Sequence, residues 1–358
     1  MYTSALIALL VLAGLLIYKG FLAKKKVMLA GGILLAVSTP LFFWLMGFWA
    51  EMLWFRELGY EHRFWTLWLT QGGLFIGGMF LTGLLTFVLT MRINKSASSI
   101  RITATVIAAL VGAFLWARNW EVFLKFFDRV PTDLTDPVLK QTTGFYLFVY
   151  PFLRLICSTL LYAGIIALGA NFTVVIQPMQ IENGVYRFNI NKSLRDSIFT
   201  GTGFTLIILG LGKYLDRFRL LFSKHGVVFG PGWTDVHVRL PLFTFVSAIT
   251  ILAGIIMLIP SIRVRFPGRI IKKDSYQGFL PWLILAGGVL AIWIIFLSLI
   301  PTAFQSLKVI PNELSLEKTY LKNNIEFTRQ GFGLDRIGLK EFSVSQPFSR
   351  EEIGRAHV

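Results

Sequence analysis

Residues 241–260 read PLFTFVSAITILAGIIMLIP, a run of twenty residues without one charged side chain. As a helix, about 20 apolar residues cross the hydrocarbon layer of a membrane, which is about 30 Å thick. Backbone polar groups find no water in that layer, and a helix satisfies them within the segment itself. This stretch therefore predicts a transmembrane helix.

Seven further apolar runs of similar character surround it, and none of the eight contains an aspartate or a glutamate. They cover residues 4–22, 27–49, 65–91, 102–117, 152–170, 198–212 and 279–300. We interpret the chain as an all-α protein, a polytopic transmembrane helical bundle of about eight spans within residues 1–300. A short soluble extracytoplasmic tail is expected after the bundle.

The composition supports this class. Hydrophobic residues make up 55% of the 358 residues and charged residues only 15%, against about a quarter charged in soluble domains. The formal net charge of +16 fits basic residues at span ends, where they face anionic lipid. No basic stripe interleaved with aromatic residues is present, so we expect membrane lipids and other envelope proteins as partners, and no nucleic acid. Cys157 is the only cysteine, which excludes an intrachain disulfide.

Charges in the loops predict the orientation of the spans. The N-terminal run has no positive charge before it, unlike a signal peptide. With the N-terminus outside, the expected cytoplasmic loops carry 15 Lys and Arg and the outer loops carry 11. This bias has the sign of the positive-inside rule. Localisation in a bacterial plasma membrane is expected, with the C-terminal tail on the extracytoplasmic side.

Residues 301–351 have a different character and are interpreted as the start of a truncated extracytoplasmic domain. Residues 311–335 predict an amphipathic, water-soluble helix capped by Asn312. Its apolar face is Leu314, Leu321, Ile325, Thr328 and Phe332. Residues 342–348 predict a strand. Residues 352–358 read EIGRAHV after Glu351, a string that a sequencing-library adapter would encode, and we expect these residues to be non-native.

Three arginines are candidates for contact with lipid headgroups. Arg154 lies just inside the run that follows Pro151, within reach of the headgroups by snorkelling. Arg217 and Arg219 follow the sixth run next to Asp216. They either bind a lipid phosphate or form an ion pair at the helix end, and the ion pair is the commoner arrangement.

Two glycines of the third run, Gly73 and Gly77, have the small-xxx-small spacing of close helix packing. A metal site is the other candidate. His225, Asp235 and His237 lie in one loop and are ligand types for metals. Their spacing matches no defined metal motif, and the glycines of the same loop indicate turns instead.

Several strings together resemble one bacterial family. They are LWFRELGY (residues 53–60), DPV with GFYLF and PFL (136–153), LDRFRLLFSKHG (215–226), WTDVHVRLP (233–241) and PNELSLEKTYLKNNIEFTRQGFGLD (311–335). They resemble the multi-pass membrane proteins catalogued as uncharacterised protein family 0182. The resemblance implies an N-terminal bundle of about seven helices followed by a large extracytoplasmic domain, and it implies no activity or catalytic residue. Two spans precede residues 53–60 here, where one is commoner in that family.

No catalytic constellation is evident. The sequence has no Ser/His/Asp set, no phosphate-binding glycine loop and no HExxH, and the four His lie outside the apolar runs. We therefore expect no enzyme activity and no cofactor. The leading hypothesis is that the bundle anchors or positions a large extracytoplasmic domain, with a role in envelope assembly or secretion. A transporter or channel is the alternative, although proton coupling needs acidic groups between helices.

Overall fold

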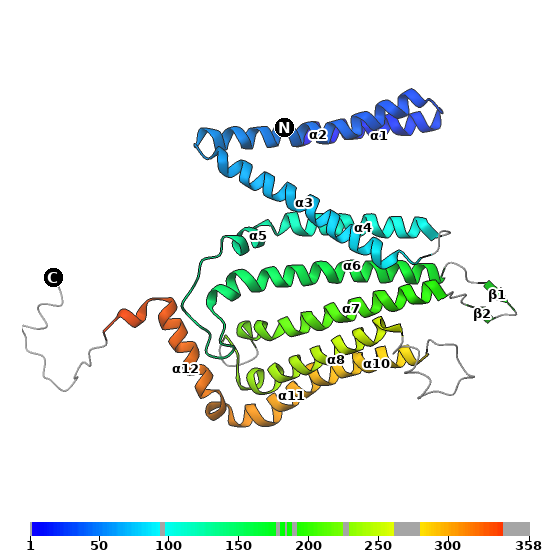
Figure 1. The fold of residues 1–358 in the computed structure, drawn as a ribbon. Coiled ribbons are helices and arrows are strands. Elements are labelled where there is room, and N and C mark those ends of the chain that lie inside the picture. Colours follow the sequence, from blue (N-terminus) through cyan, green and yellow to red (C-terminus); the bar gives the residue numbers. More distant parts are fainter. Residues whose placement is uncertain are drawn as a thin grey trace, which may run out of the picture. The chain divides into compact units, whose positions relative to one another are not determined.

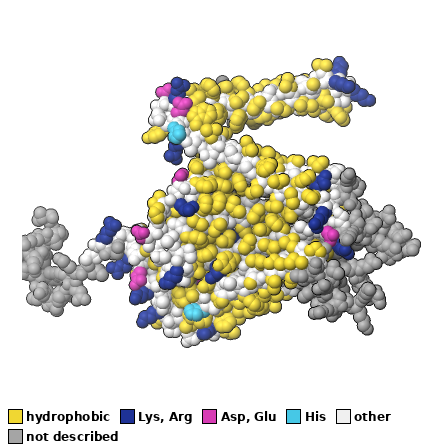
Figure 2. Space-filling view, viewed as in Figure 1, with side chains coloured by type: hydrophobic (Ala, Val, Ile, Leu, Met, Phe, Trp, Pro, Cys, Tyr) yellow, Lys and Arg dark blue, Asp and Glu magenta, His cyan; other side chains and the backbone are white. Residues whose placement is uncertain are grey.

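The computed structural model describes residues 2–93, 97–176, 180–182, 185–187, 192–224, 229–260 and 280–338, and these residues are almost entirely helical (Figure 1). Eight helical segments among them are long and apolar enough to cross a membrane, which confirms the predicted number. The segments contain α1 (Tyr2–Leu22), α2 (Lys26–Glu57), α3 (Glu61–Thr90), α4 (Ser98–Arg118), α6 (Tyr150–Ile176), α7 (Lys192–Arg219), α8 (Leu240–Leu258), and α10 (Leu280–Ile294) with α11 (Ile300–Phe304). Figure 2 shows hydrophobic side chains over the middle of the helices and Lys and Arg towards their ends.

Of the remaining described elements, only α12 is long, with 19 residues, and it continues the eighth segment. These elements are α5 (Trp120–Phe127), α12 (Glu313–Gly331), four five-residue π-helical turns described below, and three 3-10 turns, η3 (Leu220–Phe222), η8 (Ile310–Asn312) and η9 (Leu334–Arg336). Strands β1 (Gln180–Glu182) and β2 (Val185–Arg187) form an antiparallel hairpin in which Ile181 lies opposite Tyr186. The all-α expectation omitted this hairpin.

The chain divides into two compact units. Unit 1 comprises residues 1–78 and 113–120. Its α1 and α2 form a helical hairpin in which Gly32 lies against Ile17 so closely that a Cβ would come within 2.8 Å of the Ile17 backbone nitrogen. Aromatic rings join α2 to the first part of α3, with the rings of Phe48 and Phe64 5.1 Å apart and those of Phe48 and Trp68 4.9 Å apart.

Unit 2 comprises residues 79–112 and 121–358, and its helices α6, α7, α8 and α10 lie side by side (Figure 1). Small residues set the crossing of α7 and α8. A Cβ on Gly203 would lie 2.8 Å from the carbonyl oxygen of Gly254, and a Cβ on Gly254 would lie 2.7 Å from that of Gly203. Gly210 lies seven residues after Gly203 in α7, and its carbonyl accepts a hydrogen bond from the Ser247 hydroxyl of α8 at 2.8 Å. In lipid, such close packing and polar contacts hold helices together.

The glycine pair predicted in the third run is placed differently. A Cβ on Gly77 would make an ordinary contact with the Trp116 ring at 3.5 Å, and a Cβ on Gly73 would meet no atom within 4 Å. Gly203 and Gly254 approach their neighbours more closely than either. A packing role for Gly73 stays a prediction.

Each described π-helical turn of unit 2 lies just ahead of a proline, and its closing hydrogen bond comes from the residue before that proline. In these turns the N–H of Tyr150, Leu240, Ile300 or Ile310 donates to the carbonyl five residues earlier, and Pro151, Pro241, Pro301 or Pro311 follows. The turns are η2 (Phe145–Val149), η4 (Asp235–Arg239), η6 (Ile295–Leu299) and η7 (Gln305–Val309). Proline has no N–H, and its ring clashes with the carbonyl four residues back. Widening the preceding turn by one residue relieves that clash and keeps the helix continuous.

The α7–α8 crossing gives a matched test of glycine packing. Gly254→Ala adds a methyl group against the Gly203 backbone, and we expect it to lower stability by about 1–3 kcal/mol, as overpacking does. Gly169→Ala makes the same change in α6 where a Cβ meets no atom within 4 Å, so it should be neutral or stabilise by up to about 1 kcal/mol through helix propensity. Denaturation of the purified protein in mixed detergent micelles measures both, and equal effects would contradict this account of the crossing.

Candidate functional site

Helix α12 is held against one end of unit 2 by the face that carries Glu317, Tyr320 and Asn324. The Glu317 carboxylate accepts a hydrogen bond from the Trp233 backbone N–H at 3.0 Å. The Asn324 side-chain amide donates to the Phe229 carbonyl at 2.6 Å. These positions lie seven residues apart, and such residues share one side of a helix.

Gly232 leaves room for the Glu317 carboxylate because it has no side chain. A Cβ on Gly232 would lie 2.9 Å from a carboxylate oxygen of Glu317, so a larger residue there would push the carboxylate away. The Glu317 residue is 4% exposed. Its burial raises the pKa of its carboxyl group, the Trp233 N–H acts in the opposite direction, and the charges of Asp235 and Glu313 raise it further.

The apolar face predicted for this helix is not the face that docks. Leu314 is 83% exposed, Ile325 57% and Phe332 80%. Leu321 of that face is half-buried. The sequence pattern therefore identified the helix correctly, but α12 docks through Glu317, Tyr320 and Asn324, which lie about a quarter turn around the helix from the centre of the predicted face. Glu317 was missed because its partner is a backbone N–H 84 positions away, which leaves no local pattern.

Two of the three predicted metal ligands are described, and each has protein partners. Asp235 is buried, and its carboxylate binds the Arg239 guanidinium at 2.6 Å and the Gly232 N–H at 3.3 Å. The His237 ring stacks on Trp233 with 4.6 Å between centroids, and its Nδ1 lies 3.1 Å from the Trp233 carbonyl. Among the described residues, no group of three His, Cys, Asp or Glu could hold a metal ion. His225 lies outside the described residues, so the complete set stays a prediction.

A second polar cluster joins α6 and α7. The Arg154 guanidinium donates to the Asp216 carboxylate at 3.0 Å and to the Gly212 carbonyl at 3.2 Å. The Lys213 ammonium binds the other Asp216 oxygen at 2.8 Å and lies 5.0 Å from the ring centre of Trp293 in α10. The cluster thus reaches three helices.

This cluster changes the picture of the sixth span. Residues 198–212 were predicted, but α7 runs from Lys192 to Arg219 and therefore includes Asp216, which the shorter span excluded. Asp216 forms an ion pair at this helix end, but its partners are Arg154 and Lys213 rather than the predicted Arg217 and Arg219. The Arg217 guanidinium lies over the Tyr214 ring at 4.8 Å, and Arg219 is exposed. Headgroup contact by Arg154, Arg217 and Arg219 stays a prediction.

A tight loop completes this end of unit 2. The buried Asp136 carboxylate accepts hydrogen bonds from the N–H groups of Val138 and Leu139 and from the Tyr146 hydroxyl. Its own N–H donates to the Gln141 carbonyl at 2.8 Å. Lys140 takes a left-handed backbone conformation with φ of 58°. Asp136 therefore organises the loop that leads into η2 and α6.

The fold and this site define a polytopic helical membrane protein with a charged helix docked on one end of its bundle. The chain belongs to the uncharacterised protein family UPF0182, whose profile matches residues 27–357. A UPF0182 protein of Pelobacter propionicus is 30% identical over 352 residues, covering 90% of this chain and 38% of the relative. One of Geobacter sp. (strain M21) is 29% identical over 350 residues, covering 90% and 37%.

A UPF0182 protein of Synechococcus sp. (strain JA-3-3Ab) is 30% identical over 310 residues, covering 83% of this chain and 36% of the relative. The chain therefore spans little more than a third of the length of these relatives. No solved structure matches the chain.

The raised pKa of Glu317 predicts a pH-dependent docking of α12. A carboxyl group whose pKa is higher in the docked state contributes stability below its ordinary pKa near 4.5, and loses that contribution as the pH rises through the raised value. Docking should therefore weaken from pH 4.5 upward. Glu317→Gln keeps an oxygen for the Trp233 N–H but cannot ionise, so its docking should not change across this range.

Hydrogen–deuterium exchange of the α12 amides, corrected for the intrinsic rates at each pH, measures the effect. Glu326→Gln is the matched control, because Glu326 is exposed and pairs only loosely with Lys322 at 3.8 Å. The control should keep the pH dependence of the unmodified protein. An unchanged pH profile in Glu317→Gln would refute the assignment to Glu317.

Proposed function

We propose that the bundle anchors and positions a large extracytoplasmic domain in the bacterial plasma membrane, with a role in envelope assembly or secretion. The observation that carries this proposal is the pinning of α12. The helix follows α10 and α11 within one helical stretch, Gly287–Gly331, and the Glu317 and Asn324 contacts fix its direction against the bundle.

The outward side of α12 supports a role as a mounting surface. Leu314, Ile325 and Phe332 are exposed there, while Lys318 and Lys322 make the helix too charged to be a span itself. We therefore place α12 outside the membrane-spanning part of its stretch, which ends before Pro311. An exposed apolar stripe between charges is typical of a surface that another part of a protein covers.

The lengths of the relatives also support the proposal. More than half of each of the three relatives lies outside the region matched by this chain, which leaves room for a large additional domain in this family. A pinned helix transmits the orientation of the bundle to whatever follows it, whereas a flexible linker would not.

Reporter fusions test this proposal. Alkaline phosphatase, which is active only outside the cytoplasm, should be active and membrane-bound when fused after Lys340. A fluorescent protein that matures only in the cytoplasm should stay dark at the same position. Fluorescence without phosphatase activity would contradict the anchor, because α12 would then face the cytoplasm.

One observation favours a transporter or channel as a second candidate. Proton coupling needs a titratable group between helices, and the longer α7 supplies Asp216, whose side chain is 12% exposed between Arg154 and Lys213. Both carboxylate oxygens are occupied by these cations, and the residue lies in the last turn of α7. This placement fits a structural ion pair better than a relay through the bundle.

Reconstituted liposomes separate the two candidates. Under an imposed pH gradient, we expect no proton flux above that of empty liposomes, measured with an entrapped pH-sensitive dye. Asp216→Asn should not alter the flux, but should lower stability by about 1–3 kcal/mol, because Arg154 and Lys213 lose their partly buried partner. A gradient-driven flux that Asp216→Asn abolishes in folded protein would favour the transporter.

A further inference from the structure

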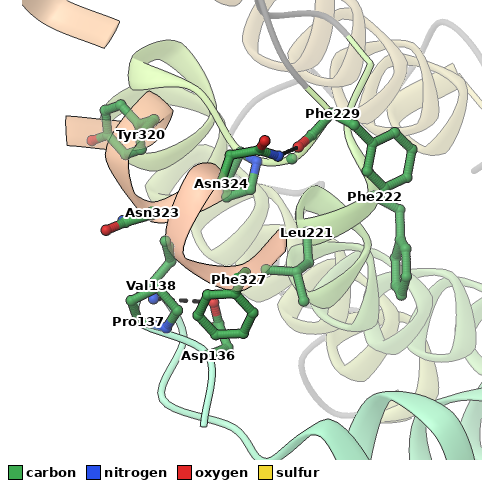
Figure 3. A pocket seen from close by; sticks show the side chains of 12 residues that line it. Asp136, Pro137, Val138, Leu221, Phe222, Phe229, Tyr320, Asn323, Asn324 and Phe327 are labelled. Carbon is green, nitrogen blue, oxygen red and sulfur yellow. Dashed lines mark hydrogen bonds between the residues drawn. The ribbon is translucent and has the colours of Figure 1, made fainter. Parts of the chain in front are cut away.

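A cavity of about 250 Å³ lies between α12, the end of α7 with η3, and the loop around Asp136. Figure 3 shows Phe327 and Asn324 on the α12 side, Leu221 and Phe222 on the η3 side, and Pro137 with Val138 on the loop side. No residue of the apolar spans before α6 lines it. The cavity belongs wholly to unit 2.

The walls offer hydrocarbon and few polar partners. Phe222, Phe229 and Phe327 contribute aromatic rings, and Pro137, Val138, Leu221 and Pro231 contribute aliphatic surface. Of the four polar side chains in the wall, Asp136, Tyr320 and Asn324 have partners in the protein, and Asn323 makes no hydrogen bond within the described residues. The Asp136 carboxylate accepts three hydrogen bonds, and the Asn324 amide is used by the Phe229 carbonyl.

An apolar occupant suits such walls better than water does. A buried water needs two to four polar partners, and a cavity without them binds apolar molecules instead. A cavity of about 150 Å³ lined by apolar side chains accepts benzene, so this one is large enough for a hydrocarbon segment of several carbons. The two phenylalanines at its edge, Phe222 and Phe229, are 46% and 55% exposed, which indicates that the cavity is open to the surroundings.

Two lysines that closely follow wall residues in the sequence favour an anionic head group. Lys140 follows the loop wall by two residues, and Lys224 follows Phe222 by two. Both are exposed, and neither has an ion pair within the described part of the chain. The acidic residue nearest the cavity is Asp136 in its wall, whose carboxylate is held by three hydrogen-bond donors. Glu326 pairs with Lys322, and Asp133 is exposed at the start of the loop.

We propose that this cavity binds the hydrocarbon chain of an anionic amphiphile whose carboxylate or phosphate lies towards Lys140 and Lys224. The chain fills the apolar space, and the two ammonium groups neutralise the head. A free fatty acid and an anionic phospholipid share this chemistry. The site does not depend on the anchoring role, because it lies on the inner side of α12 rather than on its outward stripe.

Photo-crosslinking in nanodiscs tests the site. The full chain is labelled with two probes that carry a diazirine near the end of the same alkyl chain, one a free fatty acid and the other a phosphatidylglycerol. Peptide mass spectrometry should place crosslinks on Leu221 and Phe327 with one probe or both, and the stronger probe identifies the source. Excess unlabelled amphiphile should remove these crosslinks, because the site is saturable.

Variants provide the matched comparison. Val138→Phe fills the cavity and should reduce the crosslinks at Leu221 and Phe327 at least fivefold. Ile325→Phe adds a ring on the outward side of α12, where Ile325 is 57% exposed, and should leave them unchanged. Lys140→Glu with Lys224→Glu should weaken labelling by the anionic probes severalfold, but not labelling by a phosphatidylcholine probe.

Three results would overturn the proposal. They are crosslinks that persist in Val138→Phe, crosslinks that excess amphiphile does not compete, and an absence of crosslinks at the cavity while lipid-facing helix surfaces are labelled. The last result would indicate that a side chain from another protein segment, rather than a lipid, occupies the cavity. Should Val138→Phe fail to fold, the competition experiment on the unmodified chain decides alone.

Discussion

Peptide groups inside a membrane have no water to bond with, so each helix of this protein must satisfy its own backbone. Prolines conflict with that requirement, since each removes a donor and crowds the carbonyl four residues back. In unit 2 the conflict is resolved the same way at Pro151, Pro241, Pro301 and Pro311, by a hydrogen bond that spans five residues just ahead of the proline. The helices stay continuous, and three of these turns bring residues to the end of the bundle where α12 lies (Figure 1).

The end of the bundle where α12 lies contains both the buried carboxylates of the candidate site and the two surfaces for which we propose roles. Asp136, Asp235 and Glu317 are all buried there, and each binds backbone N–H groups of a loop. Three carboxylates thus organise segments that have little regular structure of their own. The same loops leave an apolar cavity on the inner side of α12 and an apolar stripe on its outer side, so one helix separates two surfaces of similar chemistry.

The sequence predicted those parts of the fold that depend on local hydrophobicity. Eight membrane-length helices follow from eight apolar runs, because run length and bilayer thickness are directly linked. Helix ends were predicted less well, since polar residues such as Asp216 continue α7 beyond its apolar part. The Asn183 and Gly184 dipeptide, typical of tight hairpins, was a usable signal for the pairing of Ile181 with Tyr186.

The candidate site was largely beyond sequence reasoning. Arg154 and Asp216 are 62 residues apart, and Gly203 and Gly254 meet only because α7 and α8 cross at that point, so no local spacing marks either pair. Asp235 and His237 were recognised as chemically capable residues. Their partners, Arg239 and Trp233, each lie four residues away, a helical spacing that was missed because the stretch was interpreted as a loop.

The wide turn before Pro311 also determines how α12 is rotated about its own axis. One residue corresponds to about 100° around a helix axis, so the extra residue in Gln305–Val309 decides which side of α12 faces the bundle. A lineage that lost this residue would turn the stripe of Leu314, Ile325 and Phe332 by that angle relative to the loops that now bind Glu317. Length changes at this single turn are therefore a route by which related proteins could reorient an attached domain in fixed angular steps, with the spans themselves left intact.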